Sequence, residues 1–165
     1  MKYERVVVKE TLSKRRLRLW IRLLRITRVT ESHLREFLRA HESTMPRFDV
    51  MAALHRADGE LTMTELSRRL LVSNGNTTTV IDRLELDGLV QRTPSTADRR
   101  IINVALTPAG RRQFTKLAAE HEAQVDAIFG DVSSADLDAL EALLQRIEPF
   151  RKNENKRVGA YAVDG

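Results

Sequence analysis

The chain contains no cysteine, only four prolines and seven glycines among its 165 residues, and few aromatic side chains, 5% of the total. Without cysteine there is no disulfide framework, no thiolate metal site and no redox sensing through thiols. No apolar run approaches the roughly 20 residues that cross a bilayer, and the N-terminus lacks the apolar segment of a signal peptide. We therefore expect a cytoplasmic protein with no membrane partner.

Residues from which an active site is usually assembled are also sparse. The four histidines, His33, His41, His55 and His121, are scattered, and the chain has neither a glycine-rich phosphate loop nor an HExxH motif. We expect no enzyme, no metal site and no cofactor.

Positive charge is what the chain has in excess. Lysine and arginine number 28 against 23 aspartates and glutamates, which gives a net charge of +5 and an isoelectric point near 10.0. This balance favours an anionic partner such as nucleic acid or an anionic metabolite. The charge is unevenly placed: residues 1–40 hold twelve basic and four acidic side chains, whereas residues 113–148 hold two and eight.

Residues 88–110 predict a small β-hairpin with a cationic tip. Leu89 and Val90 lead into a turn region around Pro94. The β-branched and aliphatic residues of the return strand are Ile101, Ile102, Val104 and Leu106. Between the two runs lie Asp98, Arg99 and Arg100. Cationic side chains at a hairpin tip indicate a contact with phosphate.

Apolar spacing near 3.6 residues predicts helices elsewhere in the chain. The expected boundaries are a long first helix from about Leu12, a second from Thr44 and Pro46 to Asp58 and Gly59, a short third after a Thr62 to Glu65 capping box, a fourth from Ser73 to Gly88, a fifth from Thr107 and Pro108 to Gly130, and a sixth from Ser133 or Ser134 to Pro149. Two short helices followed by a hairpin have the order of a winged helix-turn-helix.

Two motifs carry a resemblance to a known family. The first is D-x-R followed by V-x-L-T-x-x-G, at Asp98–Arg100 and Val104–Gly110; the second is R-L-x-x-x-G-L-V, at Arg83–Val90. Over residues 12–148 the chain thereby resembles the MarR family of bacterial winged-helix regulators, named for multiple antibiotic resistance. The absence of cysteine disfavours the oxidant-sensing members.

The resemblance implies a mainly α fold with a small β-hairpin wing and about six helices, assembled as a homodimer. The expected organisation is an N-terminal arm at 1–11, one MarR-like domain at 12–150 and a disordered tail at 151–165. Within that domain, residues 12–42 and 107–150 form the dimerisation helices, and residues 46–106 form the winged helix-turn-helix lobe.

The helix that follows Ser73 is the expected recognition helix in the major groove. The candidates for DNA contact there are Ser73, Asn74, Asn76, Thr77, Thr78 and Arg83. Asparagine pairs bidentately with adenine, and a threonine methyl meets a thymine methyl; the same residue types also suit helix caps and turns. In the wing, similarity to the family implies that Arg100 enters the minor groove beside Arg99, while Asp98 binds the Arg100 guanidinium.

Family members commonly bind aromatic acids or their thioesters between the dimer helices and the lobe. The candidate effector-binding residues are Trp20, Arg22, His33, Phe37, Arg47, Phe48, Met51 and His55. For any one of the apolar members, ordinary core packing at helical spacing is the simpler interpretation. A stripe of arginines, Arg15, Arg18, Arg22, Arg25 and Arg28, has three interpretations: pairing with the acidic last helices, binding the phosphates of a coenzyme A thioester, or contacting the DNA backbone.

The sequence therefore predicts a homodimeric repressor that binds double-stranded operator DNA and is released by a small molecule, such as an aromatic carboxylate or its coenzyme A thioester. The alternative is a basic DNA-binding protein without sequence preference or effector response. A purely helical interaction module does not explain the hairpin.

Overall fold

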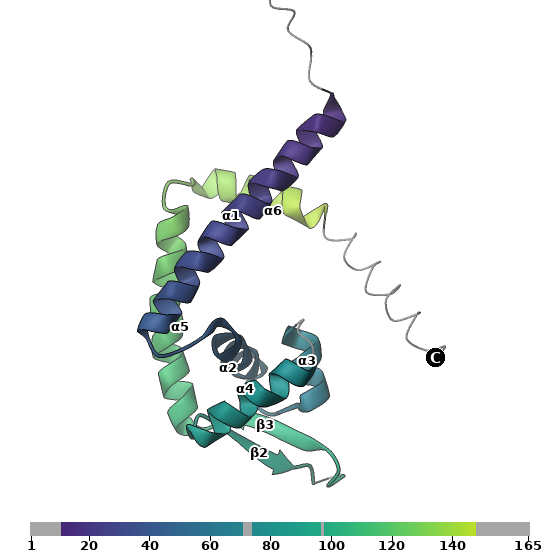
Figure 1. The fold of residues 1–165 in the computed structure, drawn as a ribbon, viewed down its shortest axis with the longest axis vertical. Coiled ribbons are helices and arrows are strands. Elements are labelled where there is room, and N and C mark those ends of the chain that lie inside the picture. The colour runs from purple at the N-terminus through teal and green to yellow at the C-terminus, as the bar shows by residue number, and fades with distance from the viewer. Residues whose placement is uncertain (1–10, 71–73, 97, 148–165) are drawn as a thin grey trace, which may run out of the picture. The chain divides into compact units, whose positions relative to one another are not determined.

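The computed structural model describes residues 11–70, 74–96 and 98–147 (Figure 1). The chain divides into two compact units, with the boundary between Gln124 and Val125. The predicted N-terminal arm up to residue 10, Ser73 and the predicted tail at 151–165 lie outside the described residues. The single domain expected over residues 12–150 stays a prediction.

The described residues form six helices and three short strands, which confirms the predicted fold class. The helices are α1 Leu12–Ala40, α2 Met45–Ala57, α3 Met63–Leu70, α4 Asn74–Leu86, α5 Pro108–Phe129 and α6 Ser134–Gln145. The strands are β1 Leu61–Thr62, β2 Val90–Pro94 and β3 Ile102–Leu106.

Polar side chains cap the N-termini of α2 and α3 at the positions that the sequence predicts. The Thr44 hydroxyl accepts from the Arg47 amide at 3.5 Å, with Pro46 in the first turn. The capping box is present: the Thr62 amide donates to Glu65 Oε2 at 2.9 Å, and the Glu65 amide donates to Thr62 Oγ1 at 3.2 Å. These bonds from the Thr62 amide and hydroxyl lower the pKa of the Glu65 carboxyl. At the other end of α2, Asp58 adopts a left-handed conformation at φ 48°.

The hairpin β2–β3 belongs to a three-stranded antiparallel sheet with the order β1-β3-β2. In β2 and β3, Val90 pairs with Leu106 and Pro94 with Ile102. Strand β1 was not predicted, because two residues between α2 and the capping box are too short to show an alternating pattern. Its Leu61 pairs with Val104.

A single core joins α2, α3, α4 and the sheet. Its most buried large side chains, each at most 1% exposed, include Val50, Leu54, Leu66, Ile81, Leu84 and Val104. Phe114 of α5, 5% exposed, belongs to the same cluster. The lobe therefore includes the first turns of α5 as well as the winged helix-turn-helix.

The T-x-x-G motif ties the base of the wing to α5. The Thr107 amide donates to the Leu89 carbonyl at 3.0 Å, and the Thr107 hydroxyl donates to the Gly88 carbonyl at 2.7 Å. The same hydroxyl accepts from the Gly110 amide at 3.0 Å. Gly110 lies directly on the Leu89 backbone: a Cβ at this position would be 2.8 Å from the Leu89 carbonyl carbon and would overlap its oxygen. Only glycine permits this approach.

Candidate nucleic-acid interface

Helix α4 presents part of the predicted contact set to solvent. Thr78 and Arg83 are exposed. Asn74 and Asn76 lie in the first turn of α4, which is the predicted position, but their side chains are outside the described part of the structure. Their role in DNA contact stays a prediction.

Thr77 is the exception in this set, because its side chain is only 2% exposed. It shares the inward face of α4 with Ile81 and Leu84, which follow it at helical spacing. The expectation that Thr77 contacts a base is therefore wrong for this conformation of the helix. Among the described residues its Oγ1 has no hydrogen-bond partner.

Replacing Thr77 by valine is expected to stabilise the protein. The substitution exchanges a buried unsatisfied hydroxyl for a methyl group of the same shape, and an unsatisfied buried polar group costs about 1–3 kcal/mol. Thermal and urea unfolding should show a gain of about 1 kcal/mol with DNA affinity unchanged. Thr78→Val, at an exposed position on the same helix, is the control and should show no gain. If Thr77→Val instead weakened DNA binding at unchanged stability, Thr77 would be a DNA-contacting residue after all.

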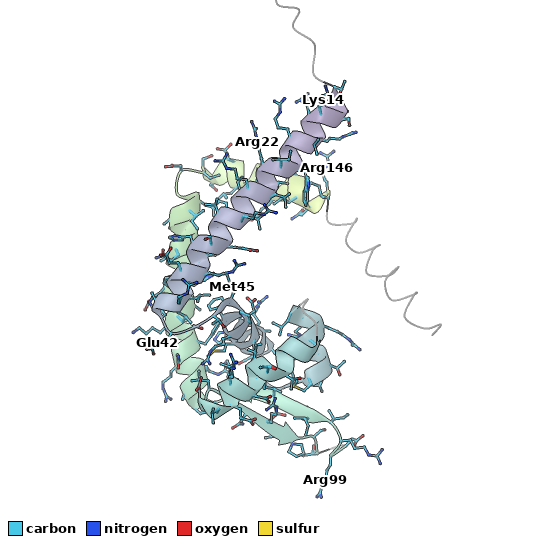
Figure 2. All side chains as sticks on the ribbon, in the orientation of Figure 1. Lys14, Arg22, Glu42, Met45, Arg99 and Arg146 are labelled. Atoms are coloured by element: carbon cyan, nitrogen blue, oxygen red, sulfur yellow. The ribbon has the colours of Figure 1, made fainter. Side chains whose placement is uncertain are left out.

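The wing tip is cationic and exposed, but Asp98 acts differently from the prediction. Asp98, Arg99 and Arg100 are all exposed, and Figure 2 shows Arg99 projecting from the end of the hairpin. Asp98 Oδ1 accepts from the backbone amide of Arg100 at 2.9 Å, and its carbonyl accepts from the Ile101 amide at 2.9 Å. The expected bond from Asp98 to the Arg100 guanidinium is not formed. Asp98 shapes the turn and leaves the guanidinium available.

The wing is joined to α4 by side chains that the sequence analysis did not single out. Arg92 of β2 donates to Asp82 and to Glu85, each at 2.6 Å, and its backbone amide donates to Glu85 Oε1 at 3.1 Å. Burial alone would lower the pKa of Arg92, but its hydrogen bonds to the two carboxylates raise it. Two acids three residues apart on α4, followed by an arginine beyond the Gly88 turn, are the sequence signal.

The predicted effector residues lie in different environments. Met51 is 2% exposed and lies in the core, and Phe48 packs against that core. Both residues therefore take part in ordinary core packing. Arg47 forms an ion pair with Asp87 at 2.6 Å. Trp20 is 56% exposed. Arg22 is exposed on the N-terminal half of α1.

Aromatic rings and histidines meet where α1 and α2 contact α5. The His121 ring stacks on Phe48 at a centroid distance of 4.4 Å, and the His55 ring lies 5.0 Å from Phe114. Burial lowers the pKa of His121, although the nearby Asp49 carboxylate acts in the opposite direction. Burial also disfavours the charged form of Asp49 and therefore raises the pKa of its carboxyl.

Two other histidines also bind α5 from α1. His33 is hydrogen-bonded to Gln124 at 3.0 Å, and His41 lies 2.7 Å from Glu120. Among the predicted effector residues, His33, Phe37, Phe48 and His55 therefore border one junction, while Trp20 and Arg22 belong to the exposed half of α1.

The arginine stripe on α1 is exposed. In the parts of the chain that the structure describes, Arg15, Arg22, Arg25 and Arg28 form no salt bridge. The three interpretations of the stripe therefore stay open. The described histidines and acids form no group of three or more that could hold a metal ion. Of the helices described, none is long and apolar enough to cross a membrane.

Helices α3 and α4, followed by the β2–β3 hairpin, define a winged helix-turn-helix. Residues 43–102 match the model of the MarR family. The fold matches the crystal structure of AbsC, a MarR family transcriptional regulator from Streptomyces coelicolor, with a TM-score of 0.78 and 25% identity over 88% of this chain and 99% of AbsC. The winged helix-turn-helix therefore matches the MarR family model, and the fold is that of a MarR family transcriptional regulator, which confirms the resemblance inferred from the motifs.

A curated regulator and a further solved structure are also similar to this chain. The HTH-type transcriptional regulator PecS of Dickeya dadantii (strain 3937) is 28% identical over 133 residues, covering 79% of this chain and 80% of PecS. BpsR of Bordetella bronchiseptica, whose structure was described with the regulation of its DNA binding by 6-hydroxynicotinic acid, has a TM-score of 0.69 and 24% identity. The match covers 79% of this chain and 98% of BpsR. At this identity the BpsR match shows the fold.

Proposed function

We propose that the chain is a homodimeric, sequence-specific repressor whose α4 and wing bind operator DNA together. The observation that carries the proposal is the wing tip: Arg99 and Arg100 are exposed, the turn that bears them is shaped by Asp98, and the wing is fixed to α4 by Arg92. Exposed arginines on a hairpin suit the narrow minor groove, where the negative potential is strongest. The exposed Thr78 and Arg83 suit contacts from α4 to the major groove.

The exposed apolar residues outside the lobe support the homodimer. On α1, Leu19, Trp20 and Ile26 are each more than half exposed, and Val29 is 65% exposed. On α6, the exposed apolar residues are Leu137, Leu140, Leu143 and Leu144. Apolar surface of this extent marks an interaction site in a folded protein, and a second copy of the chain supplies the same surface in return.

An aromatic acid is the effector class that the α1–α2–α5 junction suits best. Phe37, Phe48 and His121 offer ring surfaces there, and the regulation of BpsR DNA binding by 6-hydroxynicotinic acid is a precedent in the same fold. Because Thr107, directly before α5, and Gly110 in its first turn join α5 to the base of the wing, a ligand that moves α5 would move the wing. Binding would then favour dimers whose recognition helices no longer match successive major grooves.

Footprinting on the DNA that flanks the chain's own coding region, followed by competition binding, tests this function. We expect one protected site with two half-sites about one helical turn apart, and light scattering should show a dimer on that site. Operator binding should exceed binding to a random duplex by at least about a thousandfold. Equal affinity for both duplexes would favour the alternative of a non-specific basic DNA-binding protein.

A further inference from the structure

Three carboxylates lie at the C-terminal end of α4 and just beyond it, and each pairs with an arginine from another element. Asp82 and Glu85 both bind Arg92 of β2 at 2.6 Å, and Asp87 binds Arg47 of α2 at 2.6 Å. Unpaired carboxylates on a helix that approaches phosphate groups would repel them. The two arginines offset this repulsion from outside the helix.

The guanidinium of Arg92 is bound through both of its terminal nitrogens by carboxylates of α4. Its Nη1 donates to Glu85 and its Nη2 donates to Asp82, and the side chain is only 23% exposed. Strand β2 is an edge strand of the sheet, with β3 on one side; on the other side the Arg92 amide donates to Glu85 Oε1. Arg92 is therefore not placed to bind DNA itself.

The covalent link between α4 and the wing is short and turns at a glycine. Helix α4 ends at Leu86 and β2 begins at Val90, and between them Gly88 adopts a positive φ of 70°. The two ion pairs of Arg92 lie next to this link. A planar guanidinium that binds two carboxylates on one helix face can rotate little relative to that helix. The two ion pairs of Arg92 therefore restrict the tilt of the hairpin against α4.

We propose that Arg92 is a positioning residue for DNA recognition: with Asp82 and Glu85 it forms a clamp that holds the wing at a fixed angle to α4. The proposal rests on the proposed function, in which α4 and the wing contact one operator together. An operator complex needs both surfaces in place at once, and ordering a loose wing on binding reduces affinity. A random duplex, held mainly by phosphate contacts, requires no fixed angle.

The test is the double variant Asp82→Asn with Glu85→Gln, which removes the two negative charges of the clamp and replaces its charge-assisted hydrogen bonds by weaker neutral ones. If charge alone mattered, the loss of two negative charges from each protomer would tighten binding to every duplex. The clamp predicts a different result: binding to a random duplex tightens, while the preference for the operator over that duplex falls about tenfold, comparable to the loss of one good base contact.

Asp138→Asn with Glu141→Gln on α6 is the matched control. It removes an aspartate and a glutamate with the same three-residue spacing on a helix, both exposed and, among the described residues, outside any ion pair. It should leave the operator preference unchanged. Arg92→Gln breaks the same clamp from the β2 side and should reproduce the loss of preference with a folded dimer.

Competition titrations on the operator and on a random duplex, with light scattering on each variant, provide the readout. Operator preference that persists in both clamp variants would overturn the proposal, because the wing would then keep its angle without Arg92. A wild-type chain that shows no operator preference would contradict the proposed function itself. The wild-type titration separates these two failures.

Discussion

Gly110→Ala is expected to destabilise the protein strongly, although alanine is the better helix former. In an ordinary helix this change stabilises by up to about 1 kcal/mol. Here the added Cβ would be 2.8 Å from the Leu89 carbonyl carbon and would overlap the carbonyl oxygen that accepts from the Thr107 amide. Because both neighbours are backbone, neither can rotate away. We expect a loss of about 3 kcal/mol or more.

Thermal unfolding measures this effect directly. A loss of that size lowers the melting temperature by roughly 6–12 °C for a chain of this length. Gly59→Ala is the matched control, because the nearest atom to its Cβ would be the Ala57 oxygen at 3.9 Å. Its stability should stay within about 0.5 kcal/mol of the wild type. Equal melting temperatures for the two variants would show that α5 can move away from the wing at small cost.

The T-x-x-G motif shows why much of the fold was predictable from the sequence. Thr107 and Gly110 contact Gly88 and Leu89, about twenty residues earlier, and were predictable because the motif itself marks both positions. The Thr62 to Glu65 capping box and the left-handed Gly88 answer local requirements. These two are visible in a short stretch of sequence because the interacting groups are close along the chain.

What the sequence did not predict depends on contacts between distant residues. Strand β1 exists because Leu61 and Thr62 pair with β3, about forty residues later. Thr77 is buried because α4 turns that face toward the core of the lobe. From the sequence alone, a polar residue near a helix start is equally consistent with a helix cap and with a DNA contact. The Arg92 clamp spans ten residues and a turn.

The candidate site divides in the same way. The cationic wing tip was predictable because three adjacent residues form it, whereas the role of Asp98 was not. An aspartate two residues before an arginine can bind either its side chain or its amide, and the turn geometry favours the amide of Arg100. Four of the eight residues proposed for one effector pocket border the α1–α2–α5 junction, and the others lie in the core, in an ion pair and on the exposed half of α1.

Arg100→Ala is expected to weaken operator binding by about a hundredfold, because a dimer loses two charge-assisted contacts of ~1.5 kcal/mol each. The side chain is exposed and forms no ion pair among the described residues, so the melting temperature and the dimer should not change. The salt dependence should also weaken, with the slope of log affinity against log salt falling by about 2 for the two lost contacts.

Arg112→Ala separates a groove contact from general electrostatics. Arg112 is an exposed arginine on α5, outside the proposed interface, and its removal lowers the net charge by the same amount. If the wing enters the minor groove, Arg100→Ala should lower operator affinity far more than Arg112→Ala, and most on operators with A·T-rich flanks, where the groove is narrow. Equal effects of the two variants would mean that Arg100 adds only to the overall positive field. Recognition would then depend on α4 alone, and the fixed angle of the wing would have no consequence for binding.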